Sequence, residues 1–254
     1  MSDDRYANFD YSRLIAWDDR LKREWPLFEE LFGSAPSKRI LDLGSGTGEH
    51  ARFLASKGFD VTGVDSSQAM LEKSRAGDEA GVRFLEGDIR DIASVAGTQF
   101  GAAYCIGNVF PHLREEDDLA RLAAGLRRVL LPGAPFLLQM INYDRIEAKK
   151  ERALPLTFLP DPDDKEATII LLRTMDLQPD CRVIFMPATF RQRSDRDPPI
   201  ELLSTRRVEI RGWRRSQIDS IFRAAGFASV EALGSYLKAP FDPVESRDLI
   251  LIAR

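Results

Sequence analysis

Cysteine and histidine are scarce in this chain of 254 residues. There are two cysteines, Cys105 and Cys181, and two histidines, His50 and His112, and the members of each pair lie far apart in the sequence. Two distant cysteines exclude a disulfide framework and a cysteine-based zinc site, and they fit a reduced compartment. Two histidines exclude a site built from several imidazole ligands. The sequence therefore predicts no metal centre.

Long apolar runs and a basic excess are also missing. No run approaches the roughly 18 apolar residues that a membrane-spanning helix needs, and the acidic start of the chain lacks the basic and apolar regions of a signal peptide. Lysine and arginine number 36 against 40 acidic residues, a net charge of −4, whereas a broad nucleic-acid surface normally requires a basic excess. These absences predict a cytoplasmic protein without a membrane partner, disfavour a nucleic-acid partner, and leave open whether the chain forms a homo-oligomer.

The first half of the chain alternates between helix-like and strand-like patterns. Apolar residues at helical spacing over Arg13–Phe32 predict an N-terminal helical region, which we expect Pro26 to divide into two helices. Short apolar runs then alternate with helical patterns as far as Asn142. This alternation predicts an α/β fold with a parallel, Rossmann-like sheet and helices on both of its faces.

The pattern changes after Asn142. Tyr143–Lys165 is polar and contains proline, so we expect a connector there. Three strand-like runs without intervening helices predict an antiparallel β insertion. A helical run ending at Gly226 and two late strands follow. The predicted organisation is a helical cap (1–34), a Rossmann-like core (35–142), a connector with an antiparallel β insert (143–212), and a C-terminal helix with strands that complete the core (213–254).

A glycine-rich stretch, ILDLGSGTGE, contains the first predicted strand and the turn after it. Ligands of an open parallel sheet bind beyond the carboxyl ends of its strands, and glycines let ligand atoms approach the backbone. The dinucleotide fingerprint G-x-G-x-x-G does not fit, because it would end on Glu49 when counted from Gly44 and on Ala51 when counted from Gly46. The observed pattern is D-x-G-x-G-x-G, which begins at Asp42.

This pattern resembles the cofactor loop of class I S-adenosylmethionine-dependent methyltransferases, and further segments add to the likeness. Asp65 ends the second predicted strand, where that family places an acid on the ribose hydroxyls, and Asp88 follows the third, where the family contacts adenine. The resemblance covers roughly residues 38–142. It implies S-adenosylmethionine as the cofactor, with contacts from Arg20, Asp42, Gly44, Ser45, Gly46, Gly48, Asp65, Ser66, Met70, Asp88, Ile89, Ile106 and Gly107.

The chemistry of the implied cofactor agrees with these residue types. The cofactor has a ribose and a zwitterionic amino acid but no phosphate, so a carboxylate that binds the ribose diol, Asp65, matters more than a phosphate cradle. An acid at Asp42 can face the ammonium and sulfonium charges. Simpler roles stay open: Asp42 as a cap for amides of the loop, Asp65 as the N-cap of the next helix, and the glycines as a tight turn.

Two segments resemble the glycine and sarcosine N-methyltransferase group within this family. The first is CIGNVFPHL, where a Gly-Asn after the fourth strand is followed by an aromatic residue and a histidine, and the second is the Asn-Tyr-Asp that begins at Asn142. The N-terminal WDDRLKREW also resembles the first helix of that group, whose arginine pairs with the cofactor carboxylate. Arg20 is the candidate here and Arg23 the second choice, with a solvated helix face as the alternative for both.

One residue departs from the pattern of the glycine enzymes. They have an arginine immediately before the Asn-Tyr-Asp, and it holds the substrate carboxylate, whereas this chain has Ile141. Isoleucine cannot form a bidentate clamp on a carboxylate. We therefore expect an acceptor that is larger or less acidic than glycine. A charge from Arg173, Arg191 or Arg206 of the insert is the alternative, and an exposed strand face would also explain those arginines.

The family's chemistry is direct displacement at the methyl carbon, which depends chiefly on positioning the acceptor. The resemblance implies catalytic roles for Asn108, which would orient the acceptor, for Tyr143, which would line the pocket, and for His112 as a base. A hydrogen bond within the loop or to the cofactor is the alternative for His112. Tyr11 and Tyr236 are further candidates for the pocket wall.

The sequence thus predicts a methyltransferase that transfers a methyl group to nitrogen or oxygen of a small-molecule acceptor. Besides a nicotinamide-dependent oxidoreductase, which failed binding of a nicotinamide nucleotide would exclude, two rival functions stay open. One is methylation of RNA or protein, against which the acidic charge balance argues. The other is a non-catalytic scaffold that binds the cofactor on the same fold, which only a measurement of turnover separates from an enzyme.

Overall fold

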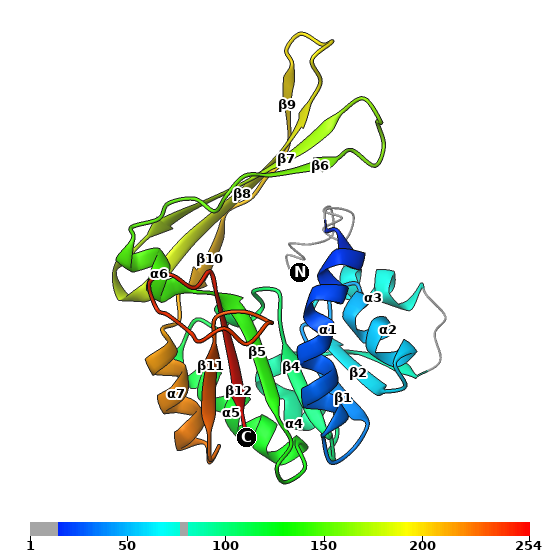
Figure 1. The fold of residues 1–254 in the computed structure, drawn as a ribbon, viewed down its shortest axis with the longest axis vertical. Coiled ribbons are helices and arrows are strands. Elements are labelled where there is room, and N and C mark those ends of the chain that lie inside the picture. Colours follow the sequence, from blue (N-terminus) through cyan, green and yellow to red (C-terminus); the bar gives the residue numbers. More distant parts are fainter. Residues whose placement is uncertain (1–14, 77–80) are drawn as a thin grey trace.

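The computed structural model describes residues 15–76 and 81–254, and its core is a seven-stranded sheet (Figure 1). The parallel strands are β1 (Arg39–Leu43), β2 (Asp60–Asp65), β3 (Val82–Glu86), β4 (Ala102–Cys105) and β5 (Phe136–Ile141). Strand β12 (Asp248–Ala253) runs antiparallel to β5, and β11 (Val230–Leu233) is antiparallel to β12, so β11 points the same way as the five parallel strands. Across the sheet the order is β11-β12-β5-β4-β1-β2-β3. The predicted parallel sheet is confirmed, and the late strands complete it beside β5.

Helices cover both faces of this sheet, as the sequence predicts. On one face lie α1 (Trp17–Gly33) and α2 (Glu49–Ser56), and on the other lie α4 (Ile92–Val95), α5 (Glu116–Val129) and α7 (Arg215–Ala224). Because successive strand side chains point to opposite faces, Tyr104 of β4 packs with the α1 side and Cys105 with the α5 side. The short helix α3 (Gln68–Arg75) packs against β2 and β3. Within residues 15–76 and 81–254, no helix is long and apolar enough to cross a membrane.

The N-terminal helix corrects one expectation. A single helix, α1, runs through Pro26, so the predicted division into two helices is wrong. Proline removes one backbone hydrogen bond and disfavours a helix interior. Here Pro26 is exposed, whereas Phe28 and Phe32 on the opposite side are buried against Tyr104 of the sheet. Burial of this aromatic face holds the helix continuous across the proline.

The segment after β5 projects from the carboxyl ends of the parallel strands as a second, antiparallel sheet (Figure 1). Its strands are β6 (Thr157–Pro160), β7 (Thr168–Leu177), β8 (Arg182–Gln192), β9 (Ile200–Thr205) and β10 (Val208–Arg211). The stretch predicted as a plain connector contains the helix α6 (Tyr143–Ala148) as well as β6. The last of the three strand-like runs predicted for the insert forms two strands. Strand β9 pairs with the C-terminal half of β8, and β10 pairs with its N-terminal half.

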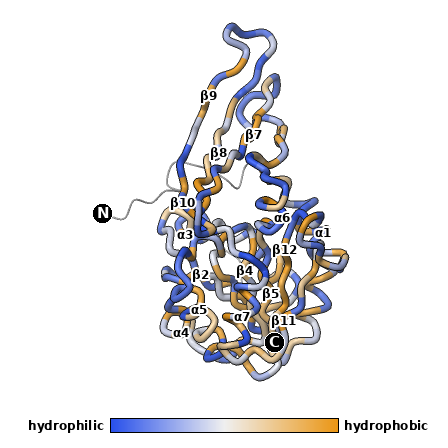
Figure 2. Tube along the Cα trace, turned by 90° about the vertical axis from the view of Figure 1, so that its left-hand side faces the viewer, coloured by the Kyte–Doolittle hydropathy of each residue, from blue (hydrophilic) through white to orange (hydrophobic). Residues whose placement is uncertain are grey.

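The C-terminal helix α7 is anchored by aromatic rings. Phe222 is buried and stacks on Phe136 of β5, with ring centroids 5.5 Å apart, and it also contacts Phe227 at 5.1 Å. Figure 2 shows hydrophobic residues along the strands of the main sheet. Aromatic burial of this kind dominates core energetics. Helix α7 is therefore part of the same folded unit as the seven-stranded sheet.

We expect Phe222→Ala to lower the free energy of unfolding by about 3–5 kcal/mol, because it removes a buried ring and leaves a cavity. Urea denaturation followed by circular dichroism measures the change. Phe158→Ala is the matched control, since Phe158 on β6 is 59% exposed, and its effect should stay within about 0.5 kcal/mol. Equal effects of the two substitutions would contradict the anchoring role.

Candidate functional site

The glycine loop lies between β1 and α2, at the carboxyl edge of the sheet. Gly44, Gly46 and Gly48 have φ angles of +75°, +54° and +86°, a region that favours glycine. A Cβ on Gly44 would lie 2.5 Å from Val109, and one on Gly48 would lie 2.5 Å from Phe84. A Cβ on Gly46 would meet no described atom within 4 Å. Packing therefore requires the outer two glycines, whereas the middle one faces open space, where a ligand can approach the backbone.

Asp65, at the end of β2, connects this loop to α3. Its carboxylate accepts hydrogen bonds from the backbone N–H of Gly46, at 2.8 Å, and of Ser67, at 2.9 Å. The N-cap of α3 is Ser67, whose hydroxyl accepts from the Met70 N–H. The simpler role that the sequence left open for Asp65, the N-cap itself, thus belongs to Ser67. Asp65 instead holds the middle of the glycine loop beside the start of α3.

Asp42 is buried in β1 directly opposite Tyr104 of β4. Burial raises the pKa of its carboxyl group to about 7, the Tyr104 hydroxyl opposes that shift, and the nearby carboxylates of Asp65 and Glu49 add to it. The amides of Gly44 and Ser45 donate to the Val64 carbonyl, that of Gly46 to Asp65 and that of Gly48 to the Ser45 carbonyl. None of these four loop amides is capped by Asp42, so its buried acid is not explained as a cap for them.

The residues after β2 and β3 form the next part of the site. Ser66 is exposed, Met70 is buried in α3, and Ile89 packs against the core beneath α5. Asp88 accepts hydrogen bonds from the backbone N–H and from the side-chain Nε of Arg90, both at 2.9 Å. Burial alone would raise the pKa of Asp88, but the Arg90 hydrogen bonds outweigh it and lower the pKa. Asp88 is therefore an ionised carboxylate already engaged by its neighbour.

The turn after β4 brings two of the predicted catalytic residues together. The Asn108 amide lies 3.5 Å from the Tyr143 hydroxyl, and its carbonyl oxygen lies 3.5 Å from the Ile141 backbone N–H at the end of β5. The backbone of Asn108 has a φ of +67°, a left-handed conformation that is uncommon for residues other than glycine. His112 is exposed in the following turn, η3 (Phe110–His112). The structure thus joins Asn108 to Tyr143 and sets His112 one turn further along.

Gly107 and Arg20 meet beside this turn. Ile106 is buried at the end of the strand, and the Gly107 N–H donates to the Gln139 side chain at 3.0 Å. A Cβ on Gly107 would lie 3.8 Å from Nη2 of Arg20, which reaches across from α1. Arg23, the second candidate on that helix, is exposed. The structure therefore brings Arg20 to the end of β4.

The two remaining tyrosine candidates lie elsewhere. Tyr236 is buried in the core that covers the α1 face of the sheet, with its ring 6.1 Å from that of Phe28. Its position fits a core residue better than a pocket wall. Tyr11 lies outside the described residues.

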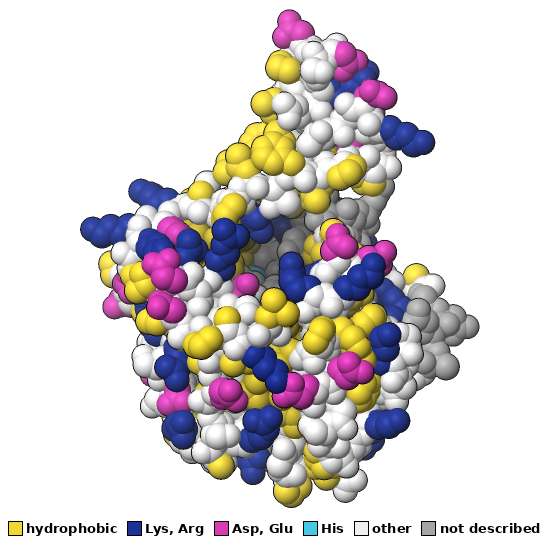
Figure 3. Space-filling view, viewed as in Figure 1, with side chains coloured by type: hydrophobic (Ala, Val, Ile, Leu, Met, Phe, Trp, Pro, Cys, Tyr) yellow, Lys and Arg dark blue, Asp and Glu magenta, His cyan; other side chains and the backbone are white. Residues whose placement is uncertain are grey.

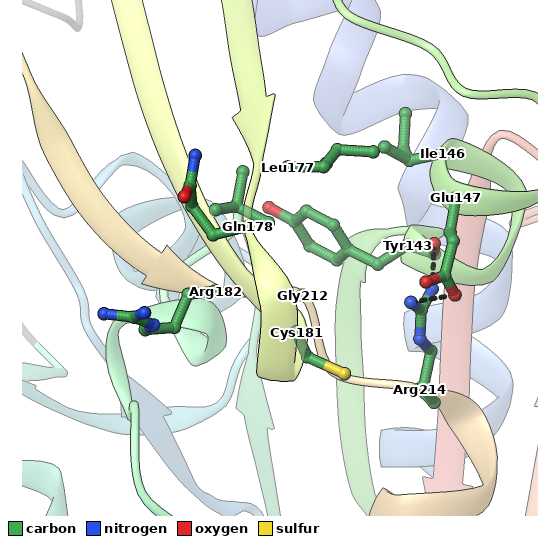
Figure 4. Close-up of a pocket in the computed structure, with 10 residues that line it drawn as sticks. Tyr143, Ile146, Glu147, Leu177, Gln178, Cys181, Arg182, Gly212 and Arg214 are labelled. Carbon is green, nitrogen blue, oxygen red and sulfur yellow. Dashed lines mark hydrogen bonds and ion pairs between the residues drawn. The ribbon is translucent and has the colours of Figure 1, made fainter.

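A small pocket marks the base of the insert, where α6, β7 and β8 meet (Figure 4). Tyr143 lies in its centre, with the ring directed toward Leu177 and Gln178. Arg214, next to α7, donates to the Tyr143 carbonyl and forms an ion pair with Glu147. Burial raises the pKa of the Tyr143 hydroxyl, and its contact with Asn108 opposes that shift only in part. Tyr143 therefore stays protonated and acts as a neutral hydrogen-bonding group.

Sequence reasoning missed one charged group, Glu24 of α1. It is only 2% exposed, and its carboxylate accepts from Nε of Arg20 at 2.9 Å and lies 2.7 Å from Nε2 of His50. The signal was present, because Glu24 falls in the same helical stripe as Trp17, Leu21 and Phe28. An acid in an apolar stripe indicates a buried partner.

The residues around the loop provide groups suited to the implied cofactor. Ser45 Oγ is buried and has no hydrogen-bond partner among the described residues, so it is a polar atom available to a ligand. Gly46 is open, and Asp65 supplies a carboxylate beside it. Figure 3 shows a hollow between the insert and the strand ends, with lysine and arginine side chains on its rim. These polar and basic groups fit a ligand that carries both a diol and a carboxylate.

Replacing Asp42 by asparagine should remove a pH dependence of stability. The unfolded chain releases the Asp42 proton near pH 3.8 and the folded chain near 7. The folded state holds the extra proton between these values, so stability falls as pH rises toward 7 and is level above it. Between pH 5 and pH 8 the free energy of unfolding of the wild type should fall by on the order of 2–3 kcal/mol more than that of Asp42→Asn. Urea unfolding at both pH values measures this difference, and parallel pH profiles would contradict the assignment.

Comparison with known proteins agrees with the fold. Residues 40–133 match the family described as a methyltransferase domain. Over 140 residues the chain is 34% identical to a glycine/sarcosine N-methyltransferase of Aphanothece halophytica, an alignment that covers 54% of this chain and 52% of that protein. The chain thus spans about half the length of the curated relatives it matches.

Solved structures extend the likeness of fold to almost the whole chain. DesVI of Streptomyces venezuelae superposes with a TM-score of 0.73 at 17% identity, covering 97% of this chain and 98% of that one. An amino pentose methyltransferase from Micromonospora echinaspora, solved with bound S-adenosylmethionine, gives 0.69 at 20% identity, covering 96% and 94%. Residues 40–133 thus match a methyltransferase domain, and the matched half of the chain is similar to the glycine/sarcosine N-methyltransferases.

Proposed function

We propose that this protein transfers a methyl group from S-adenosylmethionine to a nitrogen atom of a small-molecule acceptor. The observation that carries the proposal is the junction at Gly46, where an open glycine backbone lies hydrogen-bonded to the Asp65 carboxylate. Three relatives that each match over half of the chain are named as N-methyltransferases. Their names favour nitrogen over oxygen as the methylated atom.

In this proposal, residues of the chain bind the cofactor by its polar groups. Asp65 accepts from the ribose hydroxyls, a charge-assisted contact. Arg20 binds the carboxylate of the amino-acid portion, Ser45 Oγ supplies a further hydrogen bond, and Gly46 permits close approach. Asp42, with its pKa near neutrality, lies beneath the loop and favours nearby cationic charge once it is ionised. The bound cofactor supplies an electrophilic methyl carbon attached to sulfur.

The acceptor is positioned by the turn after β4. Asn108 and the protonated Tyr143 hydroxyl orient the acceptor by hydrogen bonds. An ammonium group must lose its proton before its nitrogen can attack, and His112, exposed at the same edge of the sheet, is the proposed proton acceptor. Ile141 offers no charge to a substrate carboxylate, so the acceptor is an amine larger or less acidic than glycine. An amino sugar, the acceptor class named for one structural neighbour, meets that description.

The antiparallel insert and the N-terminal helix are proposed to close over the acceptor and exclude water. The insert projects from the edge of the sheet at which the strands end, and α1 carries Arg20 to the same edge (Figure 1). Closure of this kind keeps the reacting groups out of bulk water. On this view residues 143–212 form the acceptor side of the protein and residues 35–142 the cofactor side.

Calorimetric titration of the purified protein with S-adenosylhomocysteine, the demethylated product, tests cofactor binding. Saturable one-site binding supports the proposal, and mass spectrometry of reactions with amines, amino sugars, amino acids and hydroxyl compounds then identifies the acceptor. Binding without turnover on any acceptor favours the non-catalytic scaffold. Turnover on RNA or protein alone favours the macromolecular rival. No binding by folded protein would refute the proposal.

Asp65→Ala should weaken S-adenosylhomocysteine binding by about 1–3 kcal/mol, the scale of a lost charged hydrogen bond. The reason is the loss of the ribose acceptor together with the support for Gly46. Asp60→Ala, at the exposed opposite end of β2, is the control and should bind as the wild type does. Calorimetry gives the affinities and thermal melting verifies folding. Equal affinities for the two variants would contradict the assignment of Asp65.

A further inference from the structure

A buried carboxylate holds together the two segments that carry the proposed cofactor contacts. Glu24 of α1 is almost fully buried, and its two oxygens have different partners. Oε1 accepts from Nε of Arg20 at 2.9 Å, one turn earlier on the same helix, and Oε2 lies 2.7 Å from Nε2 of His50 in α2. The Trp17 ring packs edge-on against His50 and beneath the Arg20 guanidinium, with 5.3 Å from the ring centroid in each case. Arg20 is thus oriented from two sides.

His50 connects this arrangement to the glycine loop. Gly48 is the N-cap residue of α2, so His50 lies in the first turn of the helix that the loop enters. Its side chain is buried between α1 and the sheet. The contact with Glu24 therefore ties the helix that carries Arg20 to the loop that carries Gly46. A displacement of either segment would have to break a buried hydrogen bond, which is costly in such surroundings.

The charges in this cluster are balanced. Burial raises the pKa of Glu24, but its hydrogen bonds and charge interactions with His50 and Arg20 outweigh burial and lower that pKa. Burial lowers the pKa of His50, and the opposing effect of Glu24 does not offset it. At neutral pH Glu24 is therefore an anion, His50 a neutral N–H donor, and Arg20 the cation that compensates the buried charge. Removing the carboxylate would leave Arg20 without its orienting acceptor.

We propose that Glu24 is a positioning residue, which aims Arg20 at the carboxylate of the cofactor's amino-acid portion and, through His50, fixes Arg20 relative to the glycine loop. The inference rests on the proposed function, since it concerns the same cofactor site. Glu24 itself does not touch the ligand in this arrangement. Its effect should be confined to ligands that carry the carboxylate that Arg20 binds.

The test compares two ligands on the full chain. S-adenosylhomocysteine has the amino-acid portion, whereas methylthioadenosine keeps the adenosine and lacks it. We expect Glu24→Gln to weaken S-adenosylhomocysteine binding about tenfold, within the usual range for a hydrogen bond to a charged group, and to change methylthioadenosine binding less than twofold. Arg20→Ala should show the same selectivity. Glu29→Gln is the matched control, because Glu29 is exposed on the same helix, and it should bind both ligands as the wild type does.

The combination of Arg20→Ala with Glu24→Gln separates positioning from a general structural role. If Glu24 acts through Arg20, the double variant binds S-adenosylhomocysteine no more weakly than Arg20→Ala alone. Full additivity, or an equal loss for the two ligands, overturns the inference. Glu24→Asp keeps the charge but withdraws it by one methylene group, so it should show the same ligand selectivity if Glu24→Gln does not fold. Lack of any wild-type binding would refute the proposed function, whereas wild-type binding with unselective variants refutes only the role of Glu24.

Discussion

The hydrogen bond from the Gly46 backbone to the Asp65 carboxylate is the contact on which the arrangement of the site depends. It joins the turn after β1 to the end of β2, two neighbouring parallel strands whose carboxyl ends lie side by side. A carboxylate that supports the backbone in this way already lies where a ribose would find an acceptor. In the proposed function the same group both shapes the loop and accepts from the ribose hydroxyls, and this double role would explain why an acid rather than another polar residue suits the end of β2.

The rest of the molecule holds that junction in place from both faces of the sheet. On one face the aromatic side of α1 packs against Tyr104, and on the other Phe222 packs against Phe136. The Val109 side chain, after β4, occupies the space beside Gly44, and the Phe84 side chain of β3 occupies the space beside Gly48. Packing thus fixes the loop's shape before any ligand binds, which is the condition for preorganised recognition.

Much of this architecture was predictable from the sequence because it is local. Apolar periodicity and the glycine spacing are read from neighbouring residues, so the strands, their order of appearance and the loop were foreseen. The continuity of α1 through Pro26 was not, since it depends on aromatic burial against a sheet distant in the chain. The division of the last insert run into β9 and β10 depends likewise on which half of β8 each strand pairs with.

The side chains of the site divide in the same way. The positions of Asp65 and Gly46 follow from the motif, and the hydrogen bond from Arg90 to Asp88 joins residues only two apart in the sequence. The burial of Glu24 against His50 is a tertiary contact, and a charged residue within an apolar helical stripe is its visible sign in the sequence. The role of His112 is still a prediction, because its exposed turn fits both a base and a loop residue.

The position of the insert in the chain has a consequence for how such a protein diversifies. It leaves the sheet after β5 and returns before α7, so the strand order of the main sheet is the same whatever lies between. Lengthening, exchanging or recombining this one contiguous stretch would change the surface above the strand ends without rewriting the codons of the glycine loop. If the proposed function holds, exchange of this single segment would change the acceptor while the cofactor half stays intact.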